Sequence, residues 1–259
     1  MSATAPSPEQ SSESPPLLEL RDVQAGYGPF RALFGVSLAV REGSVLALLG
    51  SNGAGKTTVA RVCSGLIRPT SGKFFFDGKD VTRQRAYRLA RAGIAQAPEG
   101  RSVFASLTVE ENLLLTLRRT LGRSGASGGL ARAYEMFPPL GQRRRQVAGT
   151  LSGGEQRMLA LARVLAKPPR LLVCDELSLG LAPIVVDEVY RTLRTIRDAG
   201  TTLLIVEQHV AHALALADDV AVLVKGRVTY GGPVAEMGDL SEWLLPTGES
   251  RAPSPNGHQ

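Results

Sequence analysis

The chain carries, at residues 50–57, the stretch Gly50-Ser51-Asn52-Gly53-Ala54-Gly55-Lys56-Thr57. An apolar run, Val45 to Leu49, precedes it and predicts a buried strand. A helix-compatible stretch, Lys56 to Ile67, follows it. A glycine-rich loop that joins a strand to a helix in this way is the pattern of a phosphate-binding loop. The sequence therefore predicts an α/β fold that binds a nucleotide.

Each residue type in this stretch has a chemical reason to be there. Glycines adopt backbone angles that turn successive N–H groups toward phosphate oxygens at the start of a helix. The Lys56 ammonium adds a point charge for the β- and γ-phosphates, and the Thr57 hydroxyl is a candidate Mg²⁺ ligand. Thr58 is expected on the α-phosphate side. The predicted ATP contacts of this loop are Gly50, Ser51, Asn52, Gly53, Ala54, Gly55, Lys56, Thr57 and Thr58.

A second apolar run, Leu171 to Cys174, predicts a buried parallel strand that ends in two carboxylates, Asp175 and Glu176. Ligands of open α/β sheets bind outside the carboxyl ends of the strands, so both acids should lie beside the phosphate loop. We expect Asp175 to hold Mg²⁺ and Glu176 to orient and deprotonate the attacking water. The alternative is a solvated acidic pair with no role in catalysis.

The third motif is Leu151-Ser152-Gly153-Gly154-Glu155-Gln156. Ser152 and Glu155 have the spacing of a capping box, which predicts a helix from about Gly153 to Ala166. A plain helix cap is the alternative interpretation, but two glycines after the cap leave bare N–H groups at a positive helix end, suited to a phosphate. The motif closely resembles the signature of the ATP-binding-cassette (ABC) ATPases.

That resemblance extends over nearly all of residues 17–245 and implies a pair of cassettes. In the family, two cassettes pack head to tail, and the signature contacts the ATP held by the partner. The resemblance assigns that contact to Ser152, Gly153, Gly154 and Glu155. Tyr27 stands where the family has an aromatic ring that stacks on adenine. Residues 178–181 correspond to a loop that touches the partner, and Leu177 stands where Pro is usual.

A closer resemblance is to the shorter of the two cassettes of bacterial branched-chain amino acid importers. It is carried by Ala97-Pro98-Glu99-Gly100-Arg101-Ser102-Val103-Phe104 and Leu107-Thr108-Val109-Glu110-Glu111-Asn112-Leu113. Thr108 and Glu111 form a second capping box, which predicts a helix from Val109 to about Arg119. The alternatives are the ATPase of a urea or amide importer, a soluble ABC ATPase without a transport role, and an inactive binding module.

Three further positions are candidate site residues. Glu99 stands where many ABC ATPases have a Gln that approaches ATP, and Gln208 where many have a catalytic His. His209 follows one residue later, and a shift of one residue at a strand end turns a side chain through a large angle. Gln208 can hydrogen-bond a γ-phosphate or water but cannot take a proton. Either Gln208 or His209 is the candidate switch residue.

Composition bounds the function further. The 259 residues carry a net charge of +6, mainly from Arg, without the aromatic and basic module typical of nucleic-acid binding. No apolar run reaches the roughly 20 residues that span a bilayer. Cys63 and Cys174 are expected to be buried, reduced thiols. The partners implied are permease subunits, a second identical or paralogous cassette and, indirectly, a periplasmic binding protein. The expected location is the cytoplasmic face of the membrane.

The order of predicted elements defines the architecture. The chain is β-rich to about Gly78, then helical to about Gly149 with a flexible Gly/Ser connection at 122–129, and strands alternate with helices after Leu151. We predict an α/β P-loop NTPase with a parallel core sheet, an antiparallel β part near the N-terminus and an inserted helical subdomain at about 99–150. The domain should span 17–245, with disordered tails at 1–16 and 246–259.

Overall fold

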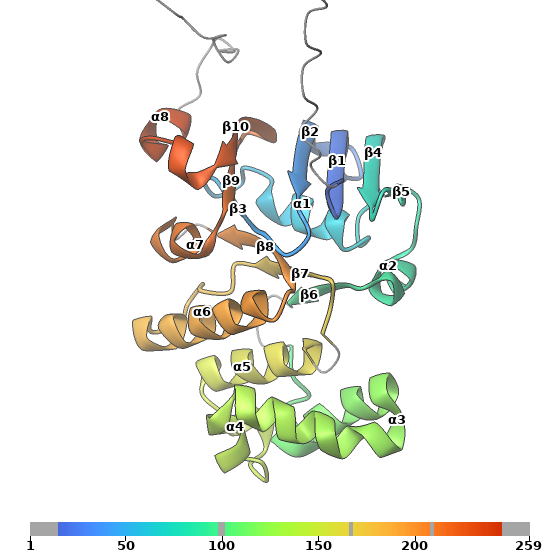
Figure 1. Ribbon diagram of the computed structural model, residues 1–259, viewed down its shortest axis with the longest axis vertical. Helices are drawn as coiled ribbons and strands as arrows, with labels where there is room; N and C mark the ends of the chain where they lie inside the picture. The colour runs from blue at the N-terminus through green and yellow to red at the C-terminus, as the bar shows by residue number, and fades with distance from the viewer. Residues whose placement is uncertain (1–14, 98–101, 166–167, 208–209, 245–259) are drawn as a thin grey trace, which may run out of the picture.

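The computed structural model describes residues 15–97, 102–165, 168–207 and 210–244. Its strands form two sheets, and helices cover both faces of the larger one (Figure 1). The larger sheet has the strand order β10-β9-β3-β8-β7-β6, in which only the edge strand β10 runs antiparallel to its neighbour. The predicted parallel core sheet is therefore confirmed. Its strands are β3 (Val45–Leu49), β6 (Ile94–Ala97), β7 (Leu171–Asp175), β8 (Thr202–Glu207), β9 (Asp219–Val224) and β10 (Arg227–Pro233).

The central strands β3, β7 and β8 are buried at every position because both of their faces are covered, and their interior residues are apolar. In β3, Val45, Ala47 and Leu49 pack in one core with α5 (Gly153–Val164), α6 (Pro183–Asp198) and α7 (Val210–Leu216). Leu46 and Leu48 face the opposite way, into a second core that includes α1 (Lys56–Cys63). The helix after the phosphate loop and the helix after the signature therefore lie on opposite faces of the sheet.

The smaller sheet is antiparallel, as predicted for the N-terminal part. Its order is β2-β1-β4-β5, and the strands are β1 (Leu18–Tyr27), β2 (Phe30–Val40), β4 (Ser71–Phe76) and β5 (Lys79–Asp80). Phe74 and Phe76 of β4 pack in the same core as α1, while Phe75, between them, points to the opposite face of the small sheet. The small sheet and α1 thus share one core, which lies on one face of the core sheet.

Helix α1 ends at Cys63, earlier than the predicted limit at Ile67. Gly65 has a φ of 70°, which a helix does not continue through, and the Leu66 N–H bonds back to the Arg61 carbonyl. Cys63 and Cys174 are buried, as predicted. Burial raises the pKa of the Cys63 thiol to about 12 and that of Cys174 still further, so both stay protonated.

The segment predicted as a flexible connection is helical, so that prediction was wrong. Helix α3 (Val109–Met136) consists of two helical parts joined at Gly122, whose φ of 73° and ψ of 178° interrupt the helix. Ala126 and Gly129 of the second part are buried, and Gly129 packs against Leu117 of the first. A Cβ on Gly129 would lie 2.3 Å from the Leu117 Cδ2 atom, so the small residues permit close packing. Tertiary contact overrides their low helix propensity.

Several elements were not predicted. Strand β6 interrupts the region expected to be helical, which does contain helix α2 (Ala86–Ala92), and β6 is too short to show a period. Strand β10, η2 (Val234–Glu236) and α8 (Leu240–Leu244) follow the last predicted strand. Helix α4 (Pro138–Gln142) and η1 (Ala148–Thr150) follow α3, within the region expected to be helical. The predicted tails lie almost wholly outside the described residues; Pro15 and Pro16 are described, and Leu17 is buried. Within the described part of the chain, no helix has the length and apolar character needed to span a bilayer.

Candidate nucleotide-binding site

The phosphate loop joins β3 to α1, as its sequence predicts. Gly50 has no room for a side chain, because a Cβ there would lie 2.3 Å from the Leu223 carbonyl oxygen of β9. Gly55 caps α1 with a φ of 105°, which favours glycine, and offers no side chain to the first N–H groups of the helix. The Gly226 N–H, in the β9–β10 turn, bonds to the Ala54 carbonyl at 2.8 Å. The neighbouring hairpin therefore holds the loop in shape.

Lys56 begins α1, and its ammonium reaches back to the start of the loop. Its side chain is 3% exposed, and its ammonium donates to the carbonyls of Gly50 at 2.9 Å and Ser51 at 3.1 Å. The same Nζ lies 3.8 Å from Glu176 Oε1. Burial lowers the pKa of Lys56, while Glu176, Asp175 and Glu207 act in the opposite direction. The cation is thus held between the loop and a group of carboxylates, where a polyphosphate would also lie.

Thr57, in the first turn of α1, and Asp175, at the end of β7, come together in the fold. The Thr57 hydroxyl donates to Asp175 Oδ1 at 3.3 Å, across 118 residues of sequence. Asp175 is the last residue of β7 and is fully buried. Among the described residues, no group of three or more His, Cys, Asp or Glu side chains could hold a metal. One hydroxyl and one carboxylate still fit Mg²⁺, which takes oxygen ligands and completes its shell with water and phosphate.

Glu176 directly follows β7 and has a φ of 47°. Hydrogen bonds to its backbone hold this left-handed conformation. Its N–H donates to the Val206 carbonyl at 2.9 Å, and its carbonyl accepts from the Leu179 N–H at 3.3 Å and from Arg157 Nη2 at 3.4 Å. The Glu176 side chain is 22% exposed, whereas Asp175 is buried. Of the two neighbouring carboxylates, Glu176 is the one that solvent water can reach.

Two buried residues of this site were missed in the sequence. Arg157 is 7% exposed and lies on α5, directly after the last residue of the signature. Glu207 is 1% exposed and ends β8, and its carboxylate accepts bonds from the N–H and the hydroxyl of Ser178. A charged residue at the end of an otherwise apolar strand was the available signal for Glu207. Arg157 gave no comparable signal, because its contact to residue 176 depends on the tertiary fold.

Tyr27 ends β1 at the hairpin to β2 and is 45% exposed. Arg61 of α1 donates to its hydroxyl at 3.1 Å and lies with its guanidinium carbon 5.8 Å from the ring centre. The ring is therefore oriented by the helix that begins at the phosphate loop. An exposed aromatic face at this position can accept a stacked base.

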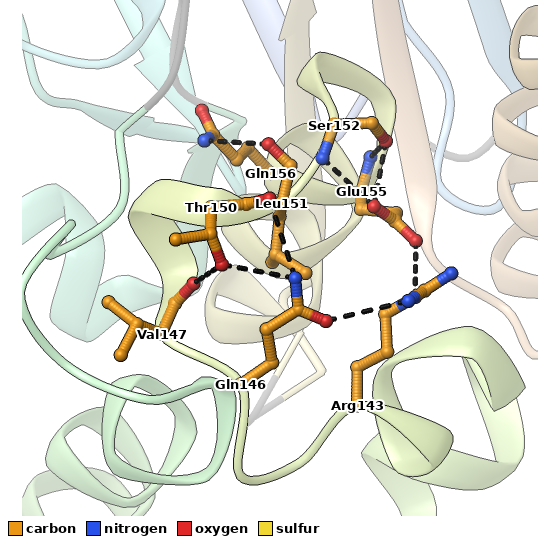
Figure 2. Close-up of polar contacts among 8 residues, drawn as sticks. All are labelled: Arg143, Gln146, Val147, Thr150, Leu151, Ser152, Glu155 and Gln156. Atoms are coloured by element: carbon orange, nitrogen blue, oxygen red, sulfur yellow. Dashed lines mark hydrogen bonds and ion pairs between the residues drawn. The ribbon is translucent and has the colours of Figure 1, made fainter.

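Figure 2 shows how the signature is built. The hydroxyl and N–H of Ser152 both donate to Glu155 Oε2, at 2.8 and 2.9 Å, and the Glu155 N–H returns a bond to the hydroxyl, so the predicted capping box is present. Arg143 bonds Glu155 Oε1 at 2.6 Å. Partial burial opposes ionisation of Glu155, but the bonds from Ser152 and Arg143 outweigh it and lower its pKa. A Cβ on Gly153 would meet only open space. The start of α5 therefore presents an uncovered backbone.

Glu99, Gln208 and His209 lie outside the described residues, so the roles expected for them remain predictions. Apart from Tyr27, the other site candidates form two separate groups. The phosphate loop, Asp175 and Glu176 converge at the carboxyl ends of β3 and β7. The signature begins α5, on the face of the sheet opposite α1.

The ABC transporter family model matches residues 33–178, which include the phosphate loop, the signature and both carboxylates. The chain belongs to the ABC transporter family of ATP-binding proteins. It is 40% identical over 212 residues to the high-affinity branched-chain amino acid transport ATP-binding protein BraG of Pseudomonas aeruginosa, covering 82% of this chain and 91% of that protein. It is 35% identical to the probable branched-chain amino acid transport ATP-binding protein LivF of Archaeoglobus fulgidus, over 85% of this chain and 94% of that one.

A solved structure is also similar to this ABC cassette. The cbiO1 protein of Clostridium perfringens, part of the ABC transporter complex cbiONQ, superimposes with a TM-score of 0.78 at 25% identity, over 88% of this chain and 93% of that one. Family membership makes this cassette an ABC transporter ATPase that binds and hydrolyses ATP.

Proposed function

We propose that this ABC cassette powers the import of branched-chain amino acids across a membrane. The observation that carries the proposal is the 40% identity to BraG over 91% of that protein's length. The cassette supplies ATP hydrolysis, and permease subunits supply the path for the solute. On this proposal the cassette is peripheral to the cytoplasmic face of the membrane, and a periplasmic binding protein delivers the solute to the permease.

The site supports hydrolysis by the following division of roles. The loop N–H groups and Lys56 would bind the phosphates, and Tyr27 would stack on adenine. Thr57 and Asp175 would hold Mg²⁺, which offsets the negative charge of the phosphates when bound. Glu176, exposed to solvent and held in place through its backbone, would orient water and accept its proton.

The signature requires a second cassette on this proposal. Its helix α5 packs on one face of the core sheet, while α1 and the phosphate loop belong to the other face. Ser152 and Gly153 are exposed, so their N–H groups can meet a phosphate that another subunit carries. Two cassettes related by a twofold axis would form two equivalent composite sites.

A pocket of about 560 Å³ is the proposed contact with the permease. Its lining comes from the end of α1, from α2 and β6, and from α3 and α5; it includes Leu66, Ala90, Ile94, Thr116 and Val164. At its rim Arg163 donates to the Ser102 carbonyl at 2.6 Å and lies 4.6 Å from the ring centre of Phe104, which is 46% exposed. An apolar pocket of this kind fits a short amphipathic helix.

Solute uptake in cells tests the proposal. Deletion of the gene should abolish the uptake of labelled leucine, isoleucine and valine, and the wild-type chain should restore it. A Glu176→Gln chain expressed at the same level should not. Urea uptake serves as the comparison. Loss of urea uptake with normal leucine uptake would identify the alternative substrate class, and normal uptake of both would contradict a role in importing either.

A further inference from the structure

Glu207 is a buried carboxylate that the catalytic roles above do not use. It ends β8 with 1% of its surface exposed. Its Oε1 accepts the Ser178 N–H at 3.0 Å, and its Oε2 accepts the Ser178 hydroxyl at 2.8 Å. Ser178 itself is 4% exposed. Burying a carboxylate is costly unless it is hydrogen-bonded, so this two-point contact fixes the two residues against each other.

The contact between Glu207 and Ser178 joins the end of β8 to the segment that follows β7. Ser178 follows the catalytic glutamate by two residues, and the Glu176 N–H bonds to Val206, the residue before Glu207. Two neighbouring residues at the end of β8, Val206 and Glu207, therefore hydrogen-bond to Glu176 and Ser178 in the segment after β7. Glu207 is also close enough to Lys56 to act on its pKa. The candidate switch residues follow Glu207 directly in the sequence.

The loop 177–182 is anchored at Ser178 and exposed at Leu179. Leu179 is 54% exposed, and Gly180 has a φ of 72° that turns the chain. Ile184, in the first turn of the following helix α6, is 77% exposed. Apolar side chains in a short turn of this kind are suited to contact with a second protein surface.

We propose that Glu207 is a positioning residue that locks loop 177–182 to the end of β8, so that closure on a partner cassette and alignment of the catalytic centre occur together. This inference rests on the proposed head-to-tail pairing. Glu207 is not placed as the base, because both of its oxygens bind Ser178 and it is 1% exposed. Its effect on hydrolysis passes through the loop and through the backbone around Glu176.

Steady-state hydrolysis by the full chain tests this role with four variants. Glu207→Ala should lower kcat by about 10- to 100-fold and leave KM within about twofold, because a misplacement near 1 Å reduces turnover while ATP binding persists. Glu207→Gln should keep kcat within about threefold, since its amide can accept the Ser178 N–H and donate to the hydroxyl. Ser178→Ala should lower kcat by about three- to tenfold.

Thr192→Ala is the matched control for Ser178→Ala. Thr192 is 7% exposed on α6, and its hydroxyl donates to the Glu188 carbonyl at 3.0 Å, away from the site. Its kcat should equal that of the wild type. Three results would overturn the proposal: wild-type kcat in Glu207→Ala, an equal loss in Glu207→Gln, or a rise in KM that matches the loss of kcat. If Glu207→Ala does not fold, equal turnover of Ser178→Ala and Thr192→Ala overturns it.

Sedimentation with saturating ATP separates this inference from the pairing on which it rests. In a Glu176→Gln background, which slows hydrolysis, ATP should produce dimers. Adding Glu207→Ala should weaken dimerisation by at least about tenfold, with ATP binding to the monomer unchanged. Unchanged dimerisation would overturn the role of Glu207 and leave the pairing intact. A Glu176→Gln chain that stays monomeric would overturn the pairing and this role together.

Discussion

Glu176 adopts a left-handed backbone conformation that hydrogen bonds from neighbouring segments stabilise. A non-glycine residue at a φ of 47° is uncommon, and the bonds to Val206 and Arg157 hold it there. The conformation turns the carboxylate out of the strand direction that Asp175 follows. Adjacent acids thus acquire different surroundings: Asp175 is buried beside Thr57, and Glu176 is open to water.

Replacing Glu176 with Gln should lower kcat by about two to four orders of magnitude, the range for losing a general base, and leave ATP affinity near that of the wild type. Steady-state turnover and a nucleotide-binding titration measure the two quantities. Glu135→Gln, an exposed carboxylate on α3, is the control and should hydrolyse ATP normally. Near-normal turnover in the Glu176 variant would refute its assignment as the base.

Lys56→Ala should instead weaken nucleotide binding. The ammonium both attracts phosphate and closes the loop through the Gly50 and Ser51 carbonyls, so its loss removes a charge and loosens the loop. We expect affinity for ATP to fall by at least about tenfold, in line with the loss of a charged hydrogen bond. The exposed Lys79, changed to Ala, is the control. Equal affinities of the two variants would contradict this role.

At the scale of elements, the close packing within α3 predicts opposite effects for two neighbouring glycines. A Cβ at Gly129 would lie 2.3 Å from Leu117 Cδ2, whereas the nearest atom to a Cβ at Gly128 is Arg132 Nη1, at 3.6 Å. Gly129→Leu should destabilise the chain by about 1–3 kcal/mol through overpacking. Gly128→Leu should be neutral or slightly stabilising, because Leu is the better helix former. Thermal unfolding measures both stabilities, and equal melting temperatures of the two variants would contradict the helical packing.

The pocket between the core sheet and α3 gives a second prediction at this scale. Phe104→Asp places a charge at an exposed side chain that packs on Arg163, a residue of the pocket lining, so docking of a permease helix should fail while the cassette still hydrolyses ATP. Uptake should fall by at least about tenfold, and the turnover of the isolated chain should stay within about threefold of the wild type. Tyr87→Asp, exposed on α2, provides a charged comparison, because the Tyr87 ring packs on Arg91, which does not line the pocket. Equal losses of uptake and turnover in Phe104→Asp would indicate an internal packing role.

At the scale of the whole molecule, the separation of the phosphate loop and the signature on opposite sheet faces predicts complementation. Ser152→Arg and Lys56→Ala chains should each be inactive alone, because every composite site in either homodimer is damaged. Mixing them creates heterodimers in which one site draws both of its halves from intact sequence. ATPase activity should return in the mixture. No recovery, with heterodimers shown by cross-linking, would mean that the sites do not work independently or are not shared.

Short-range patterns in the sequence were sufficient to predict the nucleotide-binding loop, the buried strands and both capping boxes. The stretch Gly50–Thr57 predicts phosphate binding without any distant contact, since the spacing of its glycines and its one Lys are local requirements of that binding. Likewise, Leu171 to Cys174 predicts a buried strand because β7 is covered on both faces. Ser152 and Glu155 needed only a spacing of three residues to make their cap.

Only the tertiary structure decided the features that depend on contacts between distant segments. The glycine-rich part of α3 is helical because Leu117 packs against Gly129, and the sequence composition alone indicated a flexible connection. Arg157 and Glu207 reach residues 176 and 178 from α5 and β8, across 19 and 29 positions of the chain. Local propensity describes a residue and its near neighbours, but a buried charge is placed by whichever partner the fold brings to it.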